Sequence, residues 1–169
     1  RYLEVVTSGD RLQPARRIGL ASVVAAVMFA GVGLVGCGGA EFEDRTAEVS
    51  LGETSISFDL VSCGLDGSTV FLVGRGGGAS ILQVVMELDD DASTGLVEAT
   101  GVSVDRAGEV HEAFGEQSWR ARGETGDPPG VIESAQLLGS RVQIEGRAAS
   151  SKGGTPLDLS VDARCDLKD

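Results

Sequence analysis

The chain has 169 residues, a formal net charge of −12, 41% hydrophobic residues and only 4% aromatic residues. This length suits one domain with a single hydrophobic core that follows an N-terminal leader. The negative charge argues against binding to nucleic acid or to anionic lipid headgroups, because both require a basic surface. The 25 glycines and the scarcity of aromatic residues predict many turns and a core of Val, Leu, Ile and Ala.

The N-terminal segment has the organisation of a secretory signal. Basic residues occur within 11–17, and the uncharged apolar run 18–35 follows them. The run leads into Leu-Val-Gly-Cys, the pattern of a bacterial lipobox, in which the thiol of Cys37 is diacylated. We therefore predict a helical lipoprotein signal peptide over residues 1–36. Residues 1–14 look unlike a signal and are interpreted as a fragment or a misplaced start.

Lipidation of Cys37 predicts a protein anchored to the cell membrane on its extracytoplasmic face. A diacylglycerol thioether carries two acyl chains, and two chains hold a protein to a bilayer stably where one does not. The alternative is an uncleaved transmembrane anchor, because the run 18–35 is close to the minimum length for a span. Its many Gly and Ala residues favour a signal peptide. Residues 37–46 are then a lipidated stalk, and 47–169 form the domain.

Alternation of apolar and polar residues over segments 55–60, 141–145 and 157–163 predicts half-buried antiparallel strands. Further strands are expected in apolar segments between glycine-rich turns, namely 68–74, 80–89, 97–104, 110–122 and 131–138. Segment 80–89 also fits a helical spacing, but its β-branched residues favour a strand. Short strands at this spacing predict a mainly β fold, either an antiparallel sandwich or a partly open barrel.

Two cysteines, Cys63 and Cys165, remain once Cys37 is assigned to lipid. An even pair in an oxidising compartment predicts a disulfide, and two independent buried thiols are the alternative. Cys165 shares the parity of the apolar residues of its strand, so its thiol is expected to face the core. Cys63 lacks that parity and needs a β-bulge near 61–62 to turn inward. No metal site is expected, because these cysteines and the single His111 lack ligand spacing.

Three short motifs are candidates for chemistry. Residues 74–79 match the G-x-G-x-x-A pattern of dinucleotide-binding turns, but the neighbouring strands lack intervening helices, so a hairpin loop and no cofactor are expected. Asp89–Asp91 lacks the spacing of a calcium-binding loop, which favours a solvated turn. His111 has no nucleophile motif near it and is interpreted as a surface residue. We therefore expect no catalytic residues and no enzymatic activity.

Trp119 is the only tryptophan of the chain, and basic residues follow it. We interpret it as an anchor for the core or for a sheet face, with a ligand-stacking platform as the alternative. Arg120 and Arg122 alternate with Ala121 and are expected to line one face of a strand, where they offset the acidic surface.

Five motifs occur in a fixed order: the lipobox at Cys37, Leu60–Cys63, Thr69–Gly74, Val142–Ala148 and Leu159–Cys165. In this order they resemble the mycobacterial nineteen-kilodalton lipoprotein antigen family, over residues 47–165. The resemblance implies an actinobacterial surface lipoprotein without enzymatic activity. It also implies recognition by host lipoprotein receptors through the acylated Cys37. The short acidic stalk differs from the long Thr/Ser/Ala-rich stalk of the family, so stalk glycosylation is not carried over.

The sequence thus predicts a non-enzymatic, lipid-anchored envelope lipoprotein with an antigen-like, interaction or structural role. Its expected partners are the membrane, envelope proteins and host lipoprotein receptors. The first alternative is a carrier of a lipid or small apolar ligand, which requires an apolar cavity of roughly 300 Å³ or more. The second is an accessory or inhibitory subunit of an envelope enzyme, which requires a large exposed apolar patch.

Overall fold

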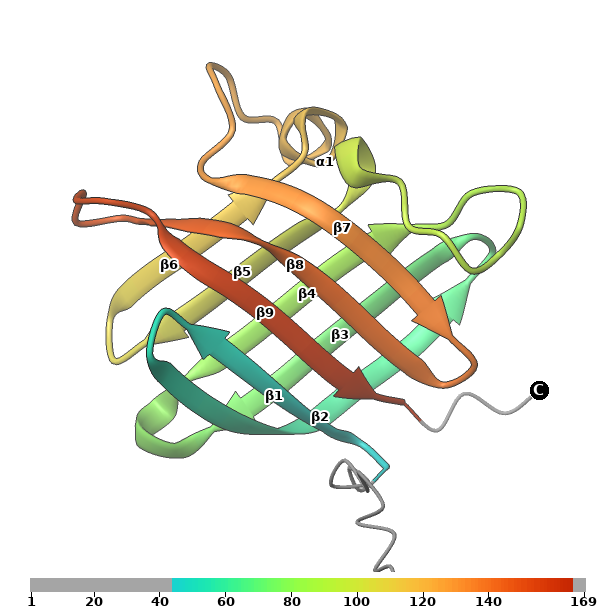
Figure 1. Ribbon diagram of the computed structural model, residues 1–169, viewed down its shortest axis with the longest axis horizontal. Coiled ribbons are helices and arrows are strands. Elements are labelled where there is room, and N and C mark those ends of the chain that lie inside the picture. The colour runs from blue at the N-terminus through green and yellow to red at the C-terminus, as the bar shows by residue number, and fades with distance from the viewer. Residues whose placement is uncertain (1–43, 166–169) are drawn as a thin grey trace, which may run out of the picture. The chain divides into compact units, whose positions relative to one another are not determined.

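The computed structural model describes residues 44–165, so the predicted signal segment 1–36 and Cys37 lie outside the described residues. Along the described chain, nine β-strands are interrupted by two short 3₁₀ turns and one α-helix (Figure 1). The strands are β1 (Thr46–Leu51), β2 (Thr54–Asp66), β3 (Thr69–Gly76), β4 (Ile81–Glu87), β5 (Gly101–Arg106), β6 (Glu109–Phe114), β7 (Val131–Leu138), β8 (Arg141–Ser150) and β9 (Leu157–Arg164). The 3₁₀ turns are η1 (Gly77–Ala79) and η2 (Val97–Ala99), and the helix is α1 (Glu116–Ala121).

The strands form one antiparallel sheet in the order β6-β5-β4-β3-β2-β1-β9-β8-β7. An additional pairing of β6 with β8 closes eight of the strands into a barrel, and β7 pairs with the rest of β8. The mainly β antiparallel fold is therefore confirmed. The architecture is the barrel and not the sandwich, and the barrel is closed where the sequence suggested a partly open one. Closure pairs the strand edges that an open sheet would expose.

The barrel interior is filled by one cluster of buried apolar side chains to which all nine strands contribute. Among its largest members, Phe58, Leu72 and Met86 are almost completely buried. Each such side chain contributes about 1.5–3 kcal/mol through the hydrophobic effect, which explains why the period-two pattern of the strands determines the fold. The residues that alternate with these along each strand point away from the core and form the outer walls of the barrel.

A β-bulge in β2 turns Cys63 toward the interior, as the sequence predicted. The register of β2 against β3 shifts between Leu60 and Ser62, so that Cys63 is the partner of the buried Leu72. Cys63 forms a disulfide with Cys165, with Cα atoms 5.7 Å apart and a sequence separation of 102. The predicted pairing is confirmed, and it joins β2 to the residue that follows β9.

The described chain begins beside the end of its last strand. The amide of Arg45 donates to the carbonyl of Arg164 over 2.7 Å, and the Leu60 amide donates to the Arg45 carbonyl over 2.7 Å. An ion pair joins Asp44 Oδ1 to Arg164 Nε at 3.0 Å. Both ends of the described chain and the Cys63–Cys165 disulfide therefore lie at the same end of the barrel.

The predicted strand 110–122 is only partly correct, because β6 ends at Phe114 and α1 begins at Glu116. Arg120 Nη2 lies 3.8 Å from Glu116 Oε1, an i,i+4 pair that a helix favours. The expectation that Arg120 and Arg122 line one face of a strand is therefore wrong. Arg120 lies on the helix, and Arg122 directly follows it.

Three other predicted strand segments can be compared with the structure. Segment 80–89 contains the strand β4, as its β-branched residues indicated. Segment 97–104 begins with η2, and its strand starts only at Gly101. The Thr100 hydroxyl donates to the carbonyl of Leu96 over 2.8 Å, which stabilises the turn in place of a longer strand. Segment 131–138 coincides with β7.

Candidate functional site

The glycine motif at 74–79 belongs to the hairpin that joins β3 to β4. A Cβ at Gly74 would lie 3.0 Å from the Cβ of Phe58, and one at Gly76 would lie 3.0 Å from the carbonyl oxygen of Ser57. These glycines therefore allow β3 to pass close to β2. The chain continues from η1 into the strand β4, whereas a pyrophosphate site requires the start of a helix. The hairpin interpretation is confirmed.

Asp91 holds together the turn that the sequence predicted at 89–91. Its Oδ1 accepts the amides of Ser93 and Thr94 over 2.8 and 2.7 Å, and its Oδ2 accepts the Thr94 hydroxyl over 2.8 Å. The backbone hydrogen bonds are the main reason that the pKa of Asp91 falls from 3.8 to about 2. Within residues 44–165, no group of three His, Cys, Asp or Glu side chains is arranged to hold a metal ion.

His111 is buried, which corrects its interpretation as a surface residue. Only 6% of it is exposed, because β6 directs its side chain inward where β6 meets β8. His111 Nε2 lies 3.6 Å from Glu109 Oε1, and no hydrogen-bond partner for the buried Nδ1 is found in the described part of the chain. The sequence carried no signal for this burial, since the pairing of β6 with β8 joins residues far apart in the chain.

Glu109 connects the side chains around this seam between β6 and β8. Ser150 Oγ donates to Glu109 Oε1 over 2.7 Å, and Lys152 Nζ lies 3.5 Å from Glu109 Oε2. The hydrogen bond from Ser150 is the largest of the effects that lower the pKa of Glu109. The serine hydroxyl faces the carboxylate and not the imidazole of His111, an arrangement that holds two strands together and does not activate the hydroxyl as a nucleophile.

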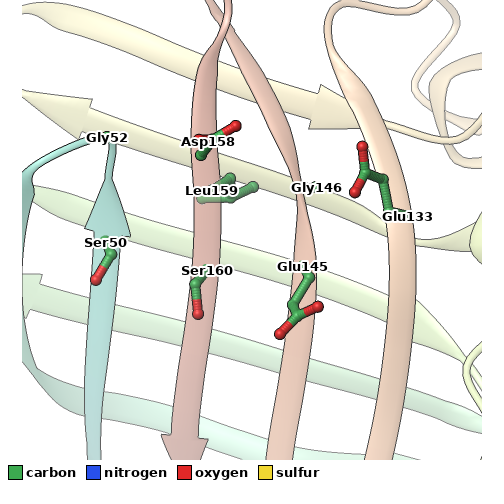
Figure 2. Close-up of a pocket in the computed structure, with 8 residues that line it drawn as sticks. All are labelled: Ser50, Gly52, Glu133, Glu145, Gly146, Asp158, Leu159 and Ser160. Carbon is green, nitrogen blue, oxygen red and sulfur yellow. The ribbon is translucent and has the colours of Figure 1, made fainter.

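The outer wall formed by β1, β9, β8 and β7 is acidic. It holds a shallow hollow with a volume of about 340 Å³. Figure 2 shows residues that line this hollow, among them Glu133, Glu145 and Asp158 with their carboxylates and Ser50 and Ser160 with their hydroxyls. Glu133 Oε1 accepts a hydrogen bond from Arg147 Nε over 3.1 Å. The hollow is open to solvent and lined by these carboxylates and hydroxyls, so we interpret this wall as a hydrated surface.

The opposite outer wall, near α1, is apolar and contains Trp119. The Trp119 ring packs against Phe114 with ring centroids 5.5 Å apart. The guanidinium of Arg122 lies 4.7 Å from the centroid of the Phe114 ring and 6.0 Å from that of Trp119. Trp119 therefore anchors α1 to a sheet face, as one of its interpretations proposed. Sequence patterns did not indicate that Phe114 and Arg122 lie against it.

Comparison of the chain with family models, curated proteins and solved structures finds no match. Membership of the lipoprotein antigen family therefore stays a prediction that rests on the motifs. In residues 44–165, none of the helices has the length and apolar character that crossing a membrane requires.

Proposed function

We propose that the protein is a non-enzymatic lipoprotein of the cell envelope, anchored through an acylated Cys37 on the extracytoplasmic face of the membrane. Its closed β-barrel serves as an interaction or structural module beside the membrane. The main support for the proposal is that two of the three cysteines pair with each other and the third lies in the lipobox. Cys63 and Cys165 form a disulfide, which favours an oxidising compartment and leaves Cys37 of the lipobox for acylation.

The position at which the described chain begins supports this tether. Six residues, 38–43, separate Cys37 from Asp44. A chain of this length spans at most about 25 Å when fully extended. Asp44 and Arg45 adjoin the end of β9, so an acylated Cys37 would hold this end of the barrel near the lipid and leave the opposite end exposed to partners.

The filled interior supports this role over that of a carrier with an internal cavity. The inward side chains of the described strands form one cluster of buried apolar residues. The candidate chemical residues have structural roles, since Asp91 organises a turn and Glu109 joins two strands. An antigen-like role depends on the acyl chains, so we expect host lipoprotein receptors to respond to the acylated Cys37 and not to the barrel.

Substitution of the lipobox cysteine tests the proposal. The full-length chain is expressed in an actinobacterial host with its own leader, and the membrane and aqueous fractions are assayed for it. Cys37→Ser should move most of the protein out of the membrane fraction, because the acyl chains provide the anchor. Gly39→Ala, which alters the same stalk but keeps the thiol, should fractionate like the unaltered protein. Retention of the Cys37→Ser chain in the membrane would contradict lipid anchoring.

A further inference from the structure

Two aromatic rings and a valine form an apolar floor on the outer wall near α1. Phe71, Val85, Gly101 and Phe114 are consecutive cross-strand partners on β3, β4, β5 and β6. Both chain neighbours of Phe71, Val85 and Gly101 are buried, as is Ala113 before Phe114, so these four residues face outward from the barrel. The Phe114 ring lies over Gly101, where a Cβ would come within 2.3 Å of it. Phe71 and Val85 remain 39% and 36% exposed.

Two hollows lie above this floor and share Val85 and Arg122 as lining residues. One is lined by Phe71, Gly101 and Phe114 as well and has a volume of about 280 Å³. The second extends from Val85 along α1 past Ala121 and has a volume of about 310 Å³. We treat the two as one open groove beside α1, because they share Val85 and Arg122, and its mainly apolar lining suits an aliphatic chain.

Arg122 is the charged residue that lines both hollows. Its guanidinium lies over the Phe114 ring and near the Trp119 ring, two cation–π contacts that favour this position of the side chain. Its ion pair with Glu112 is long, 3.7 Å from Nη1 to Oε1, and no hydrogen bond donated by this guanidinium is found among residues 44–165. An arginine fork held in this way can bind both oxygens of a carboxylate.

We infer that this groove binds a single-chain aliphatic carboxylate, a long-chain fatty acid, with its carboxylate on Arg122 and its chain over Val85. The charges of the side chains around Arg122 favour a ligand head group with a single negative charge. One guanidinium faces two nearby carboxylates, since Glu112 pairs with Arg122 and Glu87 lines the second hollow. A phosphate dianion would be repelled by both. The groove lies outside the barrel, so it differs from the internal cavity that a carrier was expected to have.

Trp119 allows a direct test, because it is the only tryptophan and its ring packs against Phe114, which lines the first hollow. The full-length chain is reconstituted in phosphatidylcholine vesicles and titrated with dibromostearic acid, whose bromines quench tryptophan fluorescence on contact. We expect saturable quenching of Trp119. Stearic acid should displace the quencher, and stearyl alcohol should require at least about ten times the concentration, because it lacks the charge that Arg122 binds.

Two variants and one matched control assign the quenching to the groove. Arg122→Gln removes the fork and should raise the half-saturating concentration at least about tenfold. Val85→Glu keeps the guanidinium of Arg122 but places a carboxylate in the exposed floor, and this variant should abolish saturable quenching. Arg147→Gln alters an arginine on the acidic wall and should leave it unchanged. Near-ultraviolet circular dichroism verifies the fold of each variant, and Val85→Glu provides the test if Arg122→Gln does not fold.

The remaining outcomes would overturn the inference. Equal quenching by dibrominated phosphatidylcholine would show that Trp119 contacts the bilayer and not a bound fatty acid. Absence of saturable quenching, or full quenching in a folded Val85→Glu chain, would exclude the groove as the site. The readout depends on Trp119 and not on the thiol of Cys37, so its failure is distinguishable from a failure of the proposed lipid anchor.

Discussion

Asp91 illustrates how a single carboxylate organises a long connection of the barrel. Its two oxygens accept three hydrogen bonds from Ser93 and Thr94 in the loop between β4 and β5. The same loop covers the outer edge of β7, since the amide of Leu137 donates to the carbonyl of Ser93 over 2.7 Å. A local turn therefore protects a strand edge that would otherwise be open to pairing with another chain.

Replacement of Asp91 by alanine should lower the thermal midpoint by a few degrees at neutral pH, because three hydrogen bonds of the turn are lost. Asp90→Ala changes the adjacent carboxylate and should have a much smaller effect. The folded-state pKa of Asp91 is about 2 against an ordinary value of 3.8. Its contribution is therefore complete above about pH 4 and is lost as the pH falls toward 2.

Thermal melts of the unaltered chain and of Asp91→Ala between pH 7 and pH 2 would reveal this dependence. The difference between their midpoints should shrink as Asp91 becomes protonated. A difference that stays constant from pH 7 to pH 2 would show that the carboxylate does not act through these hydrogen bonds.

Single residues also show how far sequence reasoning extends. The bulge before Cys63 and the inward-facing Cys165 could be predicted, because side-chain parity along one strand is a local property. The burial of His111 could not be predicted, because it depends on where β6 meets β8. Arg122 was noted for its charge alone, since stacking on Phe114 requires a helix that the strand pattern concealed.

Among the strand pairings, the seam between β6 and β8 is the shortest part of the barrel wall. It consists of the register pairs His111 with Ser150 and Glu112 with Ala149. The amide of Ser151 adds a hydrogen bond of 2.7 Å to the carbonyl of Val110. Side chains reinforce it, chiefly through the hydrogen bond from Ser150 to Glu109, so the seam is where we expect the barrel to open first.

Ser150→Ala should open this seam locally. Loss of one hydrogen bond should accelerate amide exchange at Val110, His111 and Ser151 about fivefold, with no change in β2 and β3. Thr155→Ala, in the exposed loop before β9, serves as the control and should leave exchange unaltered. Exchange that accelerates equally across the barrel would indicate a global effect, and exchange that does not accelerate at Ser151 would exclude the role given to Ser150.

The strands could be predicted from the sequence more accurately than the helix. The alternation over 157–163 is regular from Leu159 onward, because one face of the strand is buried and the other solvated. In β7 a register shift between Ile132 and Ser134 interrupts the alternation. Helix α1 is only six residues long and is held by Trp119 and Phe114 more than by its own sequence. The Glu116–Arg120 pair was the one local sign of it.

For the whole molecule, the disulfide is the main covalent constraint on the described fold. It closes a segment that runs from the end of β2 through β9, with a sequence separation of 102. In the chain-entropy account, such a loop stabilises the folded state by about 3–5 kcal/mol. Because Cys63 and Cys165 join β2 to the end of β9, the bond also ties down the end at which the described chain begins.

Replacement of both Cys63 and Cys165 by alanine should reduce the free energy of unfolding by about 3–5 kcal/mol in urea denaturation. Reduction of the unaltered chain should destabilise it to a similar extent. A double variant that unfolds at the same urea concentration as the oxidised chain would show that the bond contributes little to stability.

The two outer walls of the barrel give the molecule its functional asymmetry. The wall of β1, β9, β8 and β7 is hydrated and acidic, and the wall near α1 is apolar with one stacked guanidinium. Sequence composition predicted the acidic character but not its distribution, because neighbouring positions on a wall come from strands far apart in the chain. The central claim remains the lipid anchor at Cys37. This anchor would place both outer walls of the barrel beside the membrane, on its extracytoplasmic face.

The intact mass of the protein extracted from cell membranes tests that claim most directly. We predict a chain that begins at Cys37 and carries a diacylglycerol thioether, with Cys63 and Cys165 oxidised. A chain recovered from the cytosol with residues 18–36 still attached and an unmodified Cys37 thiol would contradict it.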